Sequence, residues 1–111
     1  MKKYKMNEAA HDLLPERMRD LQMKIVVTIV GKDSVGIIAA VSTLLANNDV
    51  NILSINQNIM DGFFNMVMIA DMTSSKIELA DVRKLLEEKG ASLGVEIKTQ
   101  HEDIFNAMHK I

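Results

Sequence analysis

The sequence has no cysteine, no tryptophan and a single proline in 111 residues. The absence of cysteine excludes disulfides, thiol nucleophiles and thiolate metal sites, and it agrees with a reducing compartment. Aromatic residues make up only 4% of the chain, so we expect a core of aliphatic residues and some of the nine methionines. No apolar run approaches the ~18 residues of a membrane-spanning helix. We therefore expect one cytoplasmic domain with no membrane partner.

The net charge is small, and catalytic groups are scarce. A formal net charge of −2 lacks the positive field that holds nucleic acid or an anionic membrane. Ser34 and Ser42 have no histidine nearby in the sequence, and His101 and His109 are too far apart to chelate one ion from a straight helix. We expect no catalytic residue, metal or cofactor. The partner is then a small molecule or another protein.

Residues 1–22 differ from the rest of the chain. They are polar and mix acidic with basic residues, while Leu14, Met18 and Leu21 have helical spacing, which predicts a helix over about 15–22. A self-sufficient domain sequence begins at Met23, so residues 1–22 are an N-terminal extension, either native, an added leader or the product of an upstream start. Residues 23–111 form the predicted domain, including a C-terminal helix.

The domain alternates strand and helix patterns. The β-branched run 24–30 predicts a central strand, and apolar residues spaced by three and four predict a helix over 35–48. Strands are expected over about 51–60 and 63–72, joined by an Asp61-Gly62 type I′ turn. Ser75 and Glu78 form the pattern of a capping box before a second helix, for which Gly90 is the predicted stop. Apolar and polar residues alternate from Val95 onward, which predicts a last strand. Residues 101–110 are predicted to form a short helix.

This order of elements predicts an α+β, ferredoxin-like βαββαβ sandwich. Right-handed crossovers joined by the hairpin give an antiparallel sheet of order 4-1-3-2 with two helices on one face. In strand 63–72 both faces are apolar. Either this strand is simply central, or the terminal helices or a second subunit cover the face away from the two helices.

The stretch IVGKDSVGIIAAVSTLLANNDVNI, residues 29–52, resembles the opening of ACT domains: a strand, an Asp-x-x-Gly turn, an amphipathic helix and a Val-Asn-Ile start to the next strand. With the order of elements, the resemblance covers residues 23 to about 100 and is greatest to the standalone bacterial and archaeal ACT proteins of uncharacterised function. It implies a regulatory homodimer or higher homo-oligomer, often joined at sheet edges. An amino acid effector would bind where the first turn of one subunit meets the second strand of another.

The turn itself suits an amino acid. A helix N-terminus offers free amides to a carboxylate, Gly36 permits close approach, and Asp33 could pair with an ammonium group. Alternatively, Asp33 or Ser34 only caps the helix. The resemblance adds Asn51 at the start of the second strand. The predicted ligand-binding residues are Gly31, Lys32, Asp33, Ser34, Val35, Gly36, Asn51, Asn56 and Asn58.

Two features separate this chain from the commoner pattern. Ser34 and Val35 replace the Arg-Pro of the usual turn, and Gly31 stands where a serine-binding domain has a side chain that helps hold the ligand. Asn56 and Asn58 can also be read as polar protection of an edge strand. The alternative function is a ligand-free homodimeric module that docks on a metabolic enzyme or a transcription factor.

Overall fold

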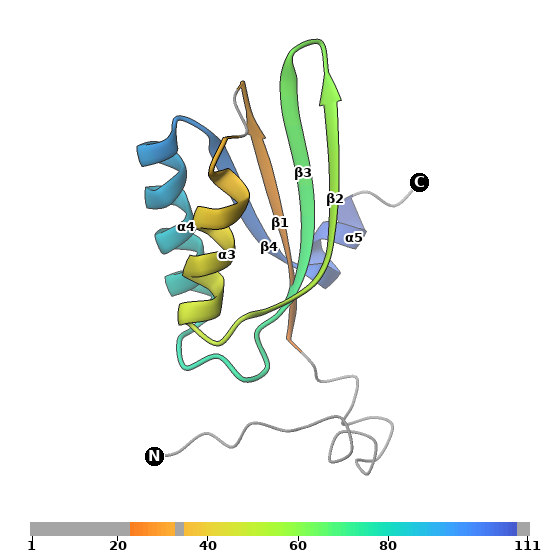
Figure 1. Ribbon diagram of the computed structural model, residues 1–111. Coiled ribbons are helices and arrows are strands. Elements are labelled where there is room, and N and C mark those ends of the chain that lie inside the picture. The colour runs from red at the N-terminus through yellow and green to blue at the C-terminus, as the bar shows by residue number, and fades with distance from the viewer. Residues whose placement is uncertain (1–22, 33–34, 109–111) are drawn as a thin grey trace.

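The computed structural model describes residues 23–32 and 35–108. The elements follow the order β1 (Lys24–Gly31), α3 (Ile37–Asn47), β2 (Asn51–Met60), β3 (Phe63–Asp71), α4 (Leu79–Leu93), β4 (Glu96–His101) and α5 (Glu102–Met108). The strands form one antiparallel sheet of order β2-β3-β1-β4, which is the predicted order read from its other edge. Helices α3 and α4 lie together on one face of this sheet (Figure 1). The ferredoxin-like prediction is confirmed; the helix predicted over 15–22 lies outside the described residues.

The core lies between the sheet and helices α3 and α4. Alternate strand residues point to the same face, so β1 and β3 each send every second side chain toward the helices. From the strands, the buried side chains include Ile25, Val27, Ile29, Phe64, Met66 and Met68. From the helices, they include Val41, Leu45, Val82 and Leu86. With few aromatic residues, methionines of β3 fill the centre of the core, as the composition predicts.

The start of α4 differs from the sequence prediction. The helix begins at Leu79, where Glu78 and Asp81 form a reciprocal cap and the Glu78 N–H donates to Asp81 Oδ2 at 3.0 Å. The predicted capping box that begins at Ser75 is wrong. The Ser75 hydroxyl is buried and donates instead to the carbonyl oxygen of Asn48 at 2.9 Å. Ser75 therefore ties the loop before α4 to the end of α3.

The end of α4 also differs. Gly90 was the predicted stop, but the helix continues to Leu93 and ends at Gly94, whose φ of 74° is left-handed. At Gly90 a Cβ atom would lie 2.8 Å from the carbonyl oxygen of Val95 and 3.0 Å from Ile97 Cγ1. Gly90 therefore allows α4 to approach β4 closely, and it does not end the helix.

The β2–β3 hairpin matches the predicted turn. Asp61 and Gly62 have φ values of 53° and 79°, as a type I′ turn requires, and Met60 pairs with Phe63. The alternation predicted for β2 holds from Ile55 onward, but a register shift between Ile52 and Ser54 places Leu53 in a bulge. β2 is an edge strand, and all its residues except Ile52 are exposed.

The sheet face away from α3 and α4 is partly covered. α5 contacts β1 and β4 on this face, Gln100 Nε2 donates to Met108 Sδ at 3.3 Å, and Val26 is buried there. Phe63 and Val67 remain exposed on the same face. β3 lies between β2 and β1, so it is central, as one of the two readings of its apolar faces predicts. Coverage of the rest of this face by a second subunit stays a prediction. Within the described residues, no helix is long and apolar enough to cross a membrane.

Candidate functional site

The turn between β1 and α3 holds most of the predicted site residues. Gly31 ends β1, Lys32 is exposed, Val35 has 84% of its surface exposed, and Gly36 caps α3. Asp33 and Ser34 lie outside the described residues, so their predicted roles in capping or ligand binding stay predictions. The described part of the turn is open to solvent.

The N-terminus of α3 presents backbone donors. Gly36 has a φ of 76°, so its left-handed conformation favours glycine, and nothing lies within 4 Å of the position of a Cβ atom there. Among the described residues no side chain caps α3, and its first turn has no acidic residue. The free amides carry a partial positive charge of roughly +0.5. This end of the helix can therefore receive a carboxylate.

Packing against Val95 explains why position 31 is a glycine. A Cβ atom on Gly31 would lie 2.4 Å from Val95 Cγ1 and 3.1 Å from Val95 Cβ. The Val95 side chain thus occupies the space that a side chain at position 31 would need. This contact explains why the position has no polar side chain to offer a ligand.

Asn51 lies at the opposite end of the sheet from the turn. Asn51 pairs with Asp71, and Asp71 pairs with Lys24 at the start of β1, whereas Gly31 is the last residue of β1. The seven steps between consecutive residues from Lys24 to Gly31 span about 23 Å at ~3.3 Å per step. Within a single chain, Asn51 therefore lies far from the turn.

Asn56 and Asn58 point to the sheet face away from α3 and α4. They pair with Val67 and Asn65, which alternate with the buried residues of β3, and both asparagines are exposed. Neither lies on the face that carries the turn. The predicted site residues thus fall into three separate places within a single chain.

The structure adds an apolar neighbour that sequence reasoning missed. Gly31 pairs with Phe64, and Phe64 pairs with Ile59, so one row across the sheet joins the turn to the far end of β2. Ile59 is on the helix side of the sheet and 64% exposed. The Asp61-Gly62 turn sets the register of β2 against β3, so counting back from this turn pairs Ile59 with Phe64. This count is the sequence signal that could have identified Ile59.

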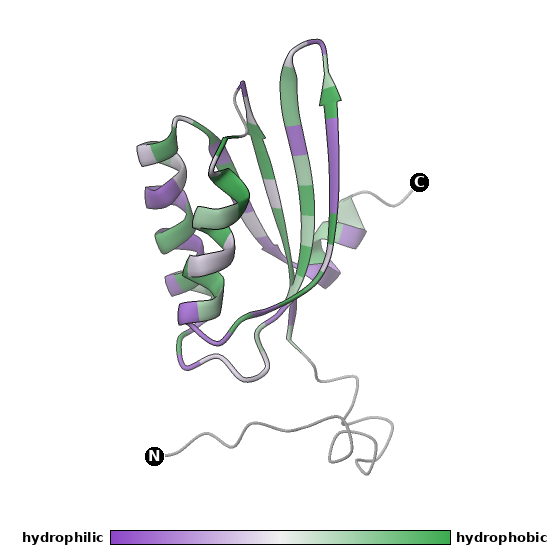
Figure 2. Cartoon of the chain, viewed as in Figure 1, coloured by the Kyte–Doolittle hydropathy of each residue, from purple (hydrophilic) through white to green (hydrophobic). Residues whose placement is uncertain are grey.

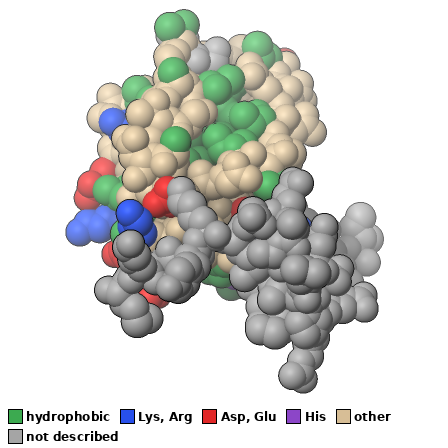
Figure 3. Space-filling model, turned by 60° about the horizontal axis from the view of Figure 1, so that its bottom comes forward, with side chains coloured by type: hydrophobic (Ala, Val, Ile, Leu, Met, Phe, Trp, Pro, Cys, Tyr) green, Lys and Arg blue, Asp and Glu red, His purple; other side chains and the backbone are tan. Residues whose placement is uncertain are grey.

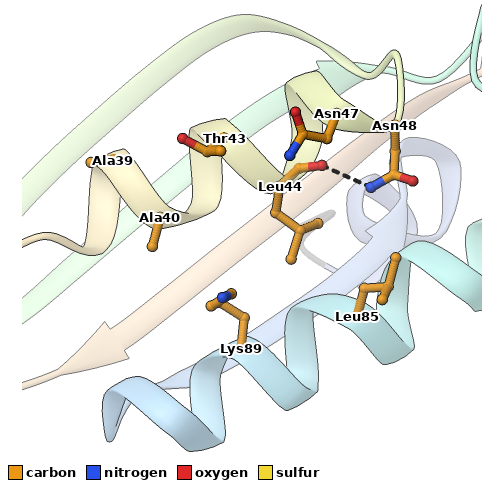
Figure 4. A pocket seen from close by; sticks show the side chains of 8 residues that line it. All are labelled: Ala39, Ala40, Thr43, Leu44, Asn47, Asn48, Leu85 and Lys89. Atoms are coloured by element: carbon orange, nitrogen blue, oxygen red, sulfur yellow. Dashed lines mark hydrogen bonds between the residues drawn. The ribbon is translucent and has the colours of Figure 1, made fainter.

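A groove separates α3 from α4 on the outside of the helical layer. It has a volume of about 460 Å³, and small and apolar residues line most of it, with Lys89 from α4 and two asparagines at the end of α3 (Figure 4). Asn48 Nδ2 donates to the carbonyl oxygen of Leu44 at 2.8 Å. The groove holds no acid–base pair. In the described part of the chain, no group of three or more histidine, aspartate or glutamate residues could hold a metal ion.

Comparisons with known proteins agree on one family. A family model described as ACT domain matches residues 23–100. The chain is 47% identical over 88 residues to a UPF0237 protein of Methanocaldococcus jannaschii, covering 79% of this chain and 98% of that protein. It is 47% identical over 89 residues to a UPF0237 protein of Clostridium perfringens, covering 80% and 100%. Among solved structures, an ACT domain protein from Streptococcus pneumoniae has a TM-score of 0.68 at 37% identity, covering 78% and 98%.

Proposed function

Because the chain belongs to the ACT domain family, we propose that it is a non-enzymatic regulatory protein that forms a homodimer and binds an amino acid or similar small effector at the dimer interface. The observation that carries this proposal is the exposed edge strand β2. Its ten residues include no charged side chain. Natural sheet edges are normally protected by lysine, proline or short length. An edge as long and uncharged as β2 favours pairing with another strand.

The surface beside this edge also favours a second copy. Leu53, Ile55 and Ile59 of β2 are 43–64% exposed. Helix α3 contains no charged residue, whereas α4 alternates charged and apolar positions (Figure 2). Figure 3 shows hydrophobic side chains gathered in a hollow on one face of the molecule. Burial of such a surface supplies the main driving force for association.

Antiparallel pairing of β2 with its copy would complete the ligand site. A two-fold axis near the middle of β2 places the first residue of one strand beside the last residue of the other. Asn51 of the second copy would then lie beside Met60 of the first copy, at the end of the sheet that carries the β1–α3 turn. Pairing would thus bring Asn51 of one copy to the same end of the sheet as the turn of the other, whereas within one chain they are about 23 Å apart along the strands.

The chemistry of this seam suits a zwitterion. The amides at the start of α3 and the exposed Lys32 attract a carboxylate, and the Asn51 amide can bind either end of an amino acid. Asp33 would pair with the ammonium group.

Analytical ultracentrifugation tests the assembly. The chain of 12.4 kDa should sediment as a species of twice that mass. Ile55→Lys should yield the monomer, because lysine on an edge strand opposes pairing. Gln100→Lys on β4 is the matched control, since β4 forms the other edge of the sheet, and it should leave the mass unchanged. A monomeric wild-type chain would contradict the proposal.

A thermal-shift screen against the standard amino acids tests the ligand. At about 100 times the dissociation constant, a ligand of the native state adds about 2.7 kcal/mol to the free energy of unfolding, which raises the Tm of a small domain by several degrees. Asn51→Ala should abolish a saturable shift. If a folded dimer responds to no amino acid, the second candidate gains support. That candidate is a ligand-free module that docks a protein on the exposed Phe63 and Val67 face.

A further inference from the structure

We propose that the segment before Met23 packs as a helix on the sheet face away from α3 and α4, beside α5. In this position it covers apolar side chains that a partner protein would otherwise contact. The inference is independent of effector binding and of pairing through the β2 edge, because it concerns a different surface of the sheet.

Several apolar side chains are exposed on this face, which we call the open face. Phe63 and Val67 of β3 are 45% and 38% exposed, and Val30 of β1 is 42% exposed. Val30 pairs with Asn65, which lies between Phe63 and Val67 on β3, so the three apolar side chains are neighbours. Exposed apolar side chains that gather in one place mark a surface that binds another element or another protein.

The open face has room for one more helix. Helix α5 contacts β1 and β4, which form one half of this face (Figure 1). In the order β2-β3-β1-β4, the midlines of the two halves lie two strand spacings apart, or ~9.6 Å. Packed helices lie about 8–10 Å apart. A helix over β2 and β3 would therefore lie at packing distance from α5.

The chain enters the domain at one end of this vacant half. The Met23 N–H donates to Thr73 Oγ1 at 3.1 Å, and the Met23 carbonyl oxygen accepts from the Met72 N–H at 2.7 Å. These two hydrogen bonds hold Met23 beside the end of β3. The segment before Met23 lies outside the described residues, but it starts from this point and can run back along β3.

The sequence of the segment suits a helix that lies along β3. Leu14, Met18 and Leu21 form one apolar stripe at helical spacing. Residues four apart rise ~6 Å along a helix, and residues two apart in a strand, such as Val67 and Ile69, are ~6.6 Å apart. Successive residues of the stripe can therefore meet successive residues of the open face.

The distance to Met23 gives the register of this contact. Leu14 precedes Met23 by nine residues, which is ~13.5 Å of helix. Val67 precedes Asp71 by four residues, which is ~13 Å of strand, and Asp71 pairs with Lys24 next to Met23. Leu14 would thus lie over Val67.

A second copy of the chain is the competing occupant. A segment tethered by a short linker has an effective concentration on the order of millimolar, so it competes well with a free chain at lower concentration. A protein that docks on Phe63 and Val67 would then have to displace the segment. The extension would act as an intramolecular cap on this surface.

Cysteine pairs test the contact in the full-length chain, because the sequence has no cysteine of its own. Leu14→Cys is combined with Val67→Cys. In the matched control it is combined with Leu85→Cys, whose wild-type side chain on α4 is 36% exposed. Equilibration in glutathione buffers gives the effective concentration of each pair of thiols. We expect a value at least about tenfold higher for the Val67 pair than for the Leu85 pair.

A third pair checks the register. Phe63 lies four residues further along β3 than Val67, so Leu14→Cys with Phe63→Cys should give a value between the other two. Circular dichroism shows whether each variant is folded. If Val67→Cys prevents folding, the Phe63 pair must still exceed the Leu85 pair.

Two results would overturn the inference. One is an equal effective concentration for the Val67 and Leu85 pairs. The other is a disulfide between two chains, formed by Val67→Cys alone or by a mixture of the single variants Leu14→Cys and Val67→Cys, which would identify a second copy as the occupant. Neither result decides whether the chain binds an effector, so the proposed function is tested separately.

Discussion

Replacing Gly31 with alanine tests whether packing against Val95 determines this position. Gly31 does not have a positive φ, so the backbone there accepts alanine. The added Cβ would nevertheless lie 2.4 Å from Val95 Cγ1, and the resulting strain costs about 1–3 kcal/mol. The lower entropy of the unfolded alanine chain returns about 0.4–1 kcal/mol. We expect a net loss of about 0.5–2 kcal/mol in the free energy of unfolding.

The Val95→Ala variant completes a double-mutant cycle. Alone, it should destabilise the protein by roughly 1 kcal/mol, because Val95 is only partly buried. In the double variant, the alanine methyl at position 31 enters the space that Val95 Cγ1 leaves, so we expect a favourable coupling of about 1–2 kcal/mol.

Urea unfolding followed by circular dichroism measures the four proteins of this cycle. The protein concentration must be the same throughout, because the stability of a dimer depends on it. If the destabilisation in the double variant equals the sum of the two single effects within ~0.5 kcal/mol, the steric argument is refuted. Gly31 would then need a different explanation, such as direct approach of a ligand to its backbone.

Two further substitutions test the corrected ends of α4. Gly90→Ala should destabilise the protein by about 1–2 kcal/mol in urea unfolding. The reason is that a clash with the Val95 carbonyl oxygen outweighs the ~1 kcal/mol gain in helix propensity. A variant more stable than the wild type would contradict the close contact. Asp81→Ala should cost about 0.5–2 kcal/mol through loss of the bond from the Glu78 N–H, whereas Glu87→Ala on the same helix should change stability by less than about 0.5 kcal/mol.

The sequence predicted the fold well because several independent signals agreed. The periodicity of Ile37, Val41 and Leu45 and the Asp61-Gly62 turn both depend on local chemistry, which tertiary contacts did not override. The ends of α4 were harder to predict. Ser75 and Glu78 can both begin a cap, and only the position of the Asn48 carbonyl, which lies 27 residues away in the chain, decides between them.

The site was less predictable than the fold because it depends on which ends of the strands meet. The sequence indicated the turn at Gly36 and the start of β2 at Asn51, and the predicted crossover puts them at opposite ends of one sheet, but it could not show that Gly31, Phe64 and Ile59 share one row. The role of Gly31 was also hidden, because Val95 follows it by 64 residues. Contacts at such separation leave no periodic signal in the sequence.

The separation of the turn from Asn51 has a thermodynamic consequence under the proposed function. If an effector contacts Gly36 in one copy and Asn51 in the other, the monomer offers only half of its contacts. The effector then binds the dimer more tightly, and by linkage it must stabilise the dimer to the same degree. Dilution would weaken binding, and saturating effector would lower the dissociation constant of the dimer. Ligand sensing and assembly would therefore be one equilibrium, so the oligomeric state itself could report the concentration of the effector.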